Sequence, residues 1–224
     1  MELMKIAIDR VLEPEVMNSI EESEAYANMD FLSVNTDFVD QLIQLGDCSG
    51  HFLDIGTGPA QIPILLAKRQ PQINITAVDL SEEMLKIAEK EVQSANLSQR
   101  VTLQMADAKK LPFPDDYFDG VFSNSVIHHI PEPIEVMLEV KRVLKPHGLI
   151  FFRDLKRLKS VDTINTIVNK YAKDETEHQR SLFRDSLFAA LTVEEMTEII
   201  RSVGLEATVT SSSDRHWSIE PNPK

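Results

Sequence analysis

Cysteine is nearly absent from this chain of 224 residues, in which Cys48 is the only one. A disulfide within the chain is therefore excluded, and so is a zinc site built from thiolates. Long apolar runs are absent as well, and the first residues, MELMKIAIDRVLEPEVM, are interrupted by charges and a proline. That pattern fits neither a secretion signal nor a membrane anchor, so we expect a cytoplasmic protein without membrane association.

Basic side chains are also scarce. The chain has 23 Lys and Arg but 36 Asp and Glu, which gives a formal net charge of -13 and a pI near 4.9. Such a chain is repelled by polyphosphates and by anionic membranes, so nucleic acid is not an expected partner. With 42% hydrophobic residues the chain can bury one substantial core, and its length favours a single domain.

Only seven glycines are present, and two of them lie close together in HFLDIGTGPAQIP, residues 51–63. This stretch predicts a strand that ends in a glycine turn and opens a helix. The turn lets the backbone approach a ligand closely, and the helix offers free N–H groups at its start. A second apolar run, INITAVDLS, contains Asp79, which is placed to accept hydrogen bonds from both hydroxyls of a ribose. These features predict a pocket for a nucleoside-type ligand.

Strand-like runs alternate with helical patterns from residue 51 onward. The predicted strands are Phe52–Ile55, Ile73–Val78, Val101–Met105, Gly120–Ser123 and Leu149–Phe152, and the predicted helices are Gln61–Arg69, Glu82–Ser94 and Pro133–Leu144. We expect Ser81 to cap the second helix, and residues 145–148 to stop the third. The alternation predicts an α/β fold with a parallel sheet and right-handed crossovers.

Additions flank this core, which we place at residues 51–155. Residues 1–50 are expected to form a helical cover, with a helix over 35–45. Residues 156–190 are expected to be a helical insertion that covers the substrate. Residues 191–224 predict a closing helix capped by Thr192 and an antiparallel hairpin. All of them belong to one predicted domain.

Four motifs carry a family resemblance: LDIGTGPA at 53–60, AVDLSEEML at 77–85, MADAKKLPFPDDYFDGVFSN at 105–124 and SVIHHIPEP at 125–133. Through them, roughly residues 50–155 resemble the class I S-adenosylmethionine-dependent methyltransferases. The likeness is to the small-molecule branch, similar to ubiquinone and menaquinone methyltransferases, with a type 11 methyltransferase domain. It implies a Rossmann-like sheet of seven strands, one antiparallel, with helices on both faces. It also implies S-adenosylmethionine as cofactor and S-adenosylhomocysteine as product.

Individual residues have physical roles in such a pocket. Asp54 orients the turn or receives the ammonium of the cofactor, while Asp79 takes the ribose hydroxyls. Asp107 accepts from the adenine amine, or instead caps a turn. Apolar side chains cover the adenine, and Asn124 lies where methyl donor and substrate meet. The expected cofactor-binding residues are Asp54, Gly56, Thr57, Gly58, Gln61, Asp79, Leu80, Met84, Ala106, Asp107, Ala108 and Asn124.

Ala60 stands where this family often has a third glycine. We expect its methyl group to be tolerated because Pro59 fits the first turn of a helix, so that the backbone is already helical at Ala60. The missing glycine argues against a dinucleotide, whose pyrophosphate needs a closer approach of the backbone.

His128 and His129 are the candidate catalytic residues. Histidine titrates near neutral pH, so either ring is a candidate general base toward the acceptor. A role as pocket wall or capping element is the stronger alternative. No metal site is expected, because adjacent histidines in a loop seldom converge on one ion. Methyl transfer itself mainly requires alignment of the acceptor and exclusion of water.

Two segments are expected to cover the carboxyl ends of the strands, where the substrate binds. In the N-terminal addition Tyr26 is the substrate candidate, with Met29, Asp30 and Phe31 beside it in a lid. In the insertion a small local excess of basic side chains is compatible with an anionic substrate held by Arg153, Arg180 or Arg184. The alternative is that these charges form an ordinary solvated face.

The predicted function is transfer of a methyl group from S-adenosylmethionine to a small molecule, with oxygen or nitrogen preferred as the acceptor atom and carbon left open. A nicotinamide-dependent oxidoreductase shares the glycine turn and the acid, but the chain has no Tyr-x-x-x-Lys pair. A non-catalytic binding protein that keeps the pocket is the other alternative. The apolar N-terminal segment also suggests a homodimer.

Overall fold

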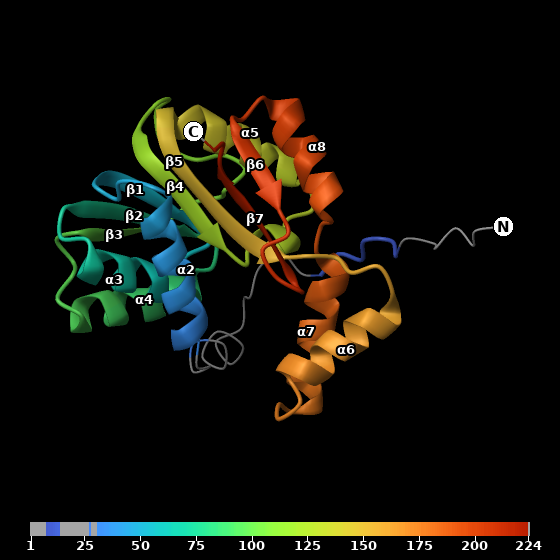
Figure 1. Ribbon diagram of the computed structural model, residues 1–224. Coiled ribbons are helices and arrows are strands. Elements are labelled where there is room, and N and C mark those ends of the chain that lie inside the picture. The colour runs from blue at the N-terminus through green and yellow to red at the C-terminus, as the bar shows by residue number, and fades with distance from the viewer. Residues whose placement is uncertain (1–7, 14–26, 28–30, 224) are drawn as a thin grey trace.

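The computed structural model of the protein describes residues 8–13, 27 and 31–223, and a twisted sheet crosses it (Figure 1). The strands are β1 (Gly50–Ile55), β2 (Ile73–Asp79), β3 (Val101–Met105), β4 (Phe118–Asn124), β5 (Leu144–Leu155), β6 (Ala207–Thr210) and β7 (His216–Pro221). Their order is β3-β2-β1-β4-β5-β7-β6, and β7 runs antiparallel to both of its neighbours. The predicted fold class, a seven-stranded Rossmann-like sheet with one antiparallel strand, is confirmed.

The strand order reverses at β1, which lies between β2 and β4 and pairs in parallel with both. The chain goes from β1 to β2 and β3 on one side, and then returns to β4 and β5 on the other. Crossovers on the two sides diverge at such a point and leave a crevice at the carboxyl ends of the strands. The glycine turn after β1 opens into this crevice.

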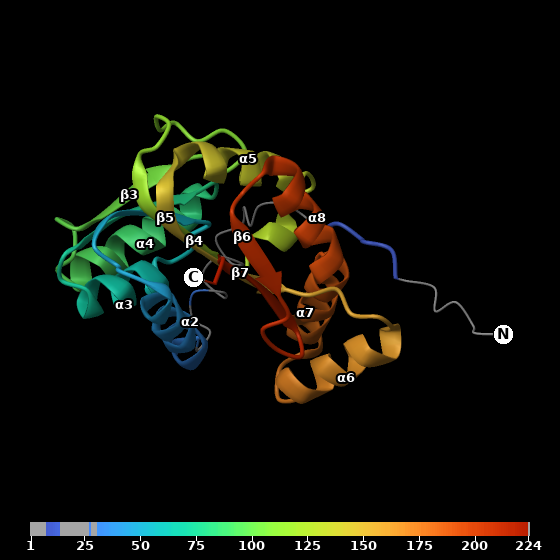
Figure 2. The same cartoon turned by 45° about the horizontal axis from the view of Figure 1, so that its top comes forward.

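Helices cover both faces of the sheet (Figures 1 and 2). On one face lie α2 (Leu32–Leu45), α3 (Gln61–Arg69) and α4 (Glu82–Ser94), and on the other lie α5 (Pro133–Val143) and α8 (Val193–Val203). Successive residues of a strand point to opposite faces. Phe151 therefore packs with Phe38 of α2, whereas its neighbour Phe152 joins Trp217 in the core under α5 and α8.

A helical hairpin of α6 (Val161–Tyr171) and α7 (Glu177–Ala189) projects beyond the end of β5 (Figure 2). It has a small core of its own, to which Leu158, Ile164 and Leu187 contribute. Thr176 begins α7 with a reciprocal capping box to Gln179. Near α7 lies η1 (Ile127–His129), a short 3-10 turn in the loop between β4 and α5.

Most local predictions agree with the structure. The limits of α3 and α4 are those expected, and the side chains of Ser81 and Thr192 cap α4 and α8. The third predicted helix ends at Val143, just before residues 145–148, as expected. The next strand differs from its prediction, because β5 begins at Leu144 instead of Leu149 and pairs with β4 through an irregularity in register.

The prediction for Ala60 is also wrong. Its backbone is left-handed, with φ 59° and ψ 25°, and helix α3 begins only after it, at Gln61. Pro59 therefore lies outside the helix. The turn takes the same shape that a third glycine would give it, and alanine occupies it at a cost of about 1–2 kcal/mol. The fold tolerates this because the Ala60 methyl group is fully buried in the core.

Candidate active site

The glycine turn joins the carboxyl end of β1 to α3. Gly56 and Gly58 have φ of 70° and 52°, values at which a side chain is strained. The N–H groups of Gly56 and Thr57 both donate to the Val78 carbonyl, which fixes the turn against β2. A Cβ on Gly56 would lie 2.0 Å from Val126 Cγ2, so the loop after β4 packs directly on the turn.

Asp79, at the end of β2, ties this turn to the start of α4. Its carboxylate accepts from the Gly58 N–H at 2.8 Å and from the Ser81 N–H at 2.9 Å. Burial raises the pKa of Asp79, and these backbone donors offset part of the rise. Each carboxylate oxygen has more than one lone pair, so both can still accept from a diol. The carboxylate is thus held in place by the backbone and suits the ribose role predicted for it.

Asp54 is the most deeply buried acid of the turn, with 2% of its surface exposed. Burial raises its pKa to about 7, the Thr57 side chain offsets part of this, and the nearby Asp79 charge adds to it. A cationic ligand would relieve both the buried acid and its repulsion from Asp79. A pyrophosphate would add to the repulsion.

The residues predicted around the adenine lie in two places. Leu80 and Met84 are at the start of α4, and Ala106, Asp107 and Ala108 follow β3. Leu80 is 41% exposed whereas Met84 is buried, so these two neighbouring side chains offer an apolar surface at the edge of the crevice. Asp107 accepts from the Lys109 N–H at 2.9 Å, which is the turn-capping role weighed as its alternative. Ala106 and Ala108 flank it, and the Ala106 N–H donates to the Asp79 carbonyl.

Gln61 reaches toward α2 and reveals a residue that the sequence did not point to. The Asn35 side chain, buried in α2, donates to Gln61 Oε1 at 2.8 Å. This contact places the N-terminal helix beside the start of α3. Nothing in the spacing of apolar residues in α2 marks Asn35, because a polar residue on the buried side of a helix gives no periodic signal.

Asn124 and Arg153 meet at the carboxyl ends of β4 and β5. Arg153 Nε lies 3.3 Å from Asn124 Oδ1, its Nη2 donates to the Val34 carbonyl, and its guanidinium lies over the Phe38 ring. Burial lowers the pKa of Arg153 to about 10, so it stays charged at neutral pH. It lines a groove of about 460 Å³ between α2 and the turn before β7, with Val34, Asp37, Asp40, Gln41, Gln44, Ser212, Ser213, Arg215 and His216.

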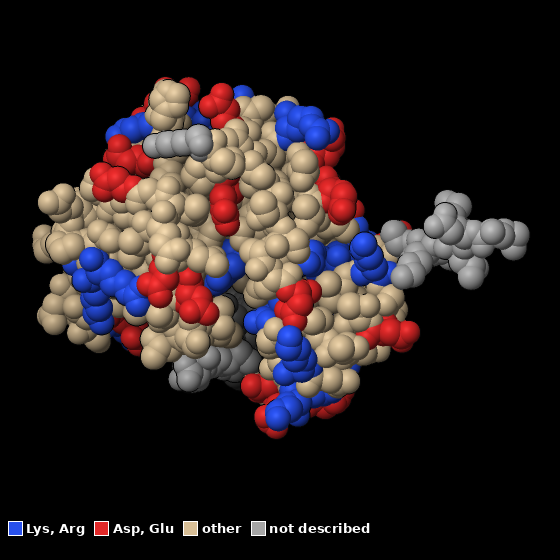
Figure 3. Space-filling view, viewed as in Figure 1, with Lys and Arg blue, Asp and Glu red and all other residues tan. Residues whose placement is uncertain are grey.

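A hollow with basic side chains around it is visible near the middle of the surface in Figure 3.

Of the other predicted substrate residues, Arg180 and Arg184 join α7 to α6. Arg180 donates to the Ala172 carbonyl and to Asn169, and Arg184 lies 3.3 Å from Asn165 Oδ1. These contacts hold the hairpin together. Tyr26 falls outside the described residues, as do Met29 and Asp30 of the predicted lid.

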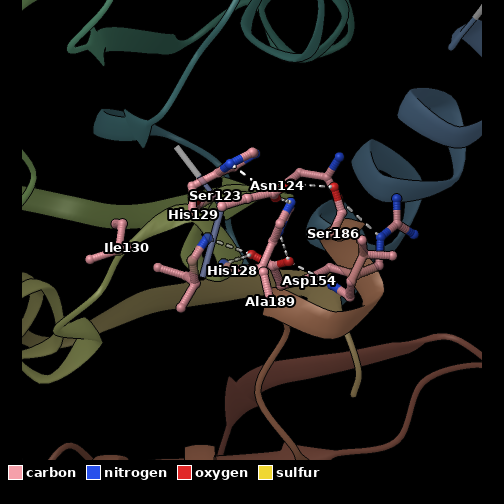
Figure 4. A network of polar contacts seen from close by, with 12 residues as sticks. Ser123, Asn124, His128, His129, Ile130, Asp154, Ser186 and Ala189 are labelled. Atoms are coloured by element: carbon pink, nitrogen blue, oxygen red, sulfur yellow. Dashed lines mark hydrogen bonds and ion pairs between the residues drawn. The ribbon is translucent and has the colours of Figure 1, made fainter. Parts of the chain in front are cut away.

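His128 and His129 lie in η1, between the end of β4 and α7 (Figure 4). His128 is buried, and its Nδ1 lies 2.5 Å from Asp154 Oδ1 on β5. Burial alone would lower the pKa of His128, but the Asp154 and Glu13 carboxylates outweigh it and hold the pKa above the ordinary value. Asp154 also accepts from the backbone N–H groups of Ile127 and Leu155. The sequence did not point to Asp154, because only the fold brings its partners in η1 to the end of β5.

The comparison with known families agrees with this arrangement. Residues 53–152 match the family model described as "Methyltransferase domain". This match supports, for residues 53–152, the resemblance to the class I methyltransferases that the sequence motifs indicate. Over 120 residues the chain is 36% identical to the ubiquinone/menaquinone biosynthesis C-methyltransferase UbiE of Rickettsia massiliae, with 52% of this chain and 48% of that protein covered. Over 131 residues it is 34% identical to methyltransferase GfsG of Streptomyces halstedii, with 58% and 47% covered.

The chain therefore spans about half the length of the curated relatives it matches. Its fold extends further: a crystal structure of a SAM-dependent methyltransferase from Aquifex aeolicus has a TM-score of 0.68 and 19% identity, and the match covers 91% of this chain and 97% of that one. The family resemblance is confirmed, and with it the predicted cofactor of the methyltransferase domain, S-adenosylmethionine.

The predicted preference for an oxygen or nitrogen acceptor has no support, because the Rickettsia relative is named a C-methyltransferase.

In the part of the chain that the structure describes, no helix has both the length and the apolar character that crossing a membrane requires.

Proposed function

We propose that the chain transfers a methyl group from S-adenosylmethionine to a small-molecule acceptor. The observation that carries the proposal is a pair of acids at one glycine turn, the buried Asp54 and the half-buried Asp79. A buried acid whose pKa is raised to about 7 is stabilised by a cation, and S-adenosylmethionine brings an ammonium and a sulfonium. An adjacent carboxylate held by backbone donors then suits the neutral diol of its ribose.

The chain's own residues bind, orient and exclude water. Asp54 and Thr57 would receive the amino acid portion, Asp79 the ribose, and Leu80 and Met84 the adenine. S-adenosylmethionine supplies a methyl group that is already activated on its sulfonium. The protein then has to hold the acceptor in line with that methyl group, which requires no particular catalytic side chain. The roles of His128 and His129 as general bases therefore stay predictions.

The alternatives fit these acids less well. A nicotinamide dinucleotide would bring its pyrophosphate beside Asp54, and its negative charge would raise the cost of ionising that acid. A binding protein that has lost catalysis would keep the same pocket, so only an assay of transfer separates it from the proposed enzyme. Cytoplasmic location, a homodimer and the absence of a nucleic-acid partner stay predictions.

For the acceptor, we propose a small molecule that binds in the groove beside Arg153. The guanidinium is charged and lies next to Asn124 at the ends of β4 and β5, where the acceptor is expected. An anionic acceptor fits this cation, although Asp37 and Asp40 line the same groove. Arg180 and Arg184 remain predicted substrate contacts. The name of the Rickettsia relative favours a carbon acceptor, so carbon stands beside oxygen and nitrogen.

The test is transfer of label from methyl-labelled S-adenosylmethionine to panels of phenols, amines and activated carbon acids. We expect at least one acceptor to be labelled by the wild-type protein, with transfer lost in Asp79→Ala. Glu198→Ala, at an exposed position on α8, is the matched control and should retain transfer. Binding of S-adenosylmethionine without label transfer to any panel would favour the non-catalytic alternative.

A further inference from the structure

A cluster of possible metal ligands lies at η1, in the loop between β4 and α5. It joins Glu13, from the described stretch 8–13, to His128 and His129 in η1. Glu13 Oε1 lies 3.5 Å from His128 Nε2 and 3.2 Å from His129 Nδ1. The three donor atoms all lie within 4.8 Å of one another. Two segments more than a hundred residues apart in sequence thus converge on one point.

The orientation of His128 is the one expected of a metal ligand. Its Nδ1 contacts the Asp154 carboxylate at 2.5 Å (Figure 4), and its Nε2 lies 3.5 Å from Glu13 Oε1. Histidines that bind metals almost always donate their other ring N–H to a carboxylate or carbonyl, which fixes the tautomer. Asp154 is itself held by backbone donors and is 1% exposed.

Glu13 is held in position from its other side. Ser186 of α7 donates to Glu13 Oε2 at 3.2 Å, and the neighbouring Val11 N–H donates to the Phe188 carbonyl. Arg10 binds four backbone carbonyls, among them those of His128 and Ala189, and so fastens this stretch to both η1 and α7. These contacts hold Glu13 and η1 in place without using the three atoms that would bind the ion.

Glu13 Oε1 is paired with the two histidine rings but makes no hydrogen bond among the described residues. It is buried, and the two ring nitrogens lie within 3.5 Å of it. A buried carboxylate oxygen in this state is costly. Both ring nitrogens approach it without hydrogen-bond geometry, which is how ligand atoms arrange themselves around a common ion.

We propose that Glu13, His128 and His129 bind one divalent transition-metal ion, of which Zn²⁺ is the best fit. Two imidazoles and a carboxylate form a donor set that Zn²⁺ accepts, with a fourth position left open. At zinc–ligand distances of about 2.0–2.2 Å, neighbouring atoms of a tetrahedron lie roughly 3.3–3.6 Å apart. The distances of 3.5 and 3.2 Å from Glu13 Oε1 are close to this edge length.

The sequence analysis expected no metal here, because two adjacent histidines seldom converge on one ion. The structure adds Glu13 as a third ligand and Asp154 as the partner that orients His128. The proposal does not rest on methyl transfer, since the ion would also fasten the stretch 8–13 to η1. A histidine that binds the ion cannot act as a general base, so the metal site and the predicted base role of that histidine exclude each other.

The experiment is a titration of the full chain, freed of metal by a chelator, with Zn²⁺ by calorimetry and with Co²⁺ by visible absorption. We expect one equivalent of each ion to bind, with the absorption of Co²⁺ in a four-coordinate site. Loss of an outer carboxylate partner typically weakens a metal site about 10–100-fold, so loss of a ligand should cost at least about a hundredfold. Glu13→Gln and His129→Ala are the ligand variants, and each is checked by circular dichroism.

His178→Ala is the matched control, because His178 is exposed on α7 and should leave both titrations unchanged. Glu13→Gln keeps the size of the side chain and an acceptor for Ser186, so a folded variant is expected. If the wild-type protein is folded and binds neither ion, the cluster is a buried ion pair and the proposal is overturned. Binding that persists in both folded ligand variants would overturn it as well. S-adenosylhomocysteine binding, measured on the same samples, reports separately on the proposed function.

Discussion

Asp54→Asn removes a charge that the fold opposes and keeps the size of the side chain. Burial raises the pKa of Asp54 from its ordinary 3.8 to about 7. Between these values the folded protein keeps a proton that the unfolded chain has lost. The free energy of unfolding of the wild-type protein therefore falls as the pH rises through this window, by about 1.4 kcal/mol per pH unit on account of Asp54.

The asparagine variant has no titrating group at this position, so its free energy of unfolding does not show this fall with pH. Its free energy of unfolding should exceed that of the wild type by about 1–2 kcal/mol at pH 5 and by about 4 kcal/mol at pH 8. Urea unfolding of both proteins, followed by circular dichroism across this pH range, measures the difference. A difference that is the same at both ends of the range would refute the reasoning.

Asp119→Asn is a control of opposite sign. Burial acts to raise the pKa of Asp119, but the His51 N–H and the Lys145 ammonium outweigh it and lower the pKa. An acid with a lowered pKa contributes stability above its unfolded value and loses it as the pH falls. This variant should therefore be less stable than the wild type at neutral pH, with the deficit shrinking toward acid pH.

Three further predictions concern backbone and packing. Ala60→Gly removes the strain of a left-handed alanine but also a buried methyl group, so it should change the free energy of unfolding by less than about 1 kcal/mol. Ala88→Gly, inside α4, has no such strain to relieve and should lower the free energy of unfolding by about 2 kcal/mol. Urea unfolding measures both. Gly56→Ala places Cβ against Val126 and should cost at least about 2 kcal/mol, of which Val126→Ala recovers part. Cys48 is buried, and burial raises the pKa of its thiol to about 11, so a thiol reagent should label it only after unfolding.

The parts of the site that the sequence could predict are local ones. Asp54, the glycine turn and Asp79 each belong to a strand end followed by a helix start, and such signals extend over a few neighbouring residues. The same holds for Ser81, whose side chain caps α4 as expected. Ala60 was predicted wrongly because its residue type favours a helix, while the turn imposes a left-handed backbone.

The parts that could not be predicted depend on contacts between distant segments. Asn35 meets Gln61 only because α2 packs beside α3, and Glu13 meets His128 only because the stretch 8–13 crosses to η1. Arg153 was expected to bind substrate from its charge. The structure also gives it contacts with Asn124 and α2, which no pattern of spacing announces.

Calorimetric titration of the full chain with S-adenosylhomocysteine, run beside NADH and repeated on Asp79→Ala, tests the central claim most directly. The account predicts that S-adenosylhomocysteine binds the wild-type protein, that NADH does not, and that a folded Asp79→Ala variant loses the binding. No binding of S-adenosylhomocysteine by folded wild-type protein would contradict it, and binding of NADH instead would point to the nicotinamide alternative.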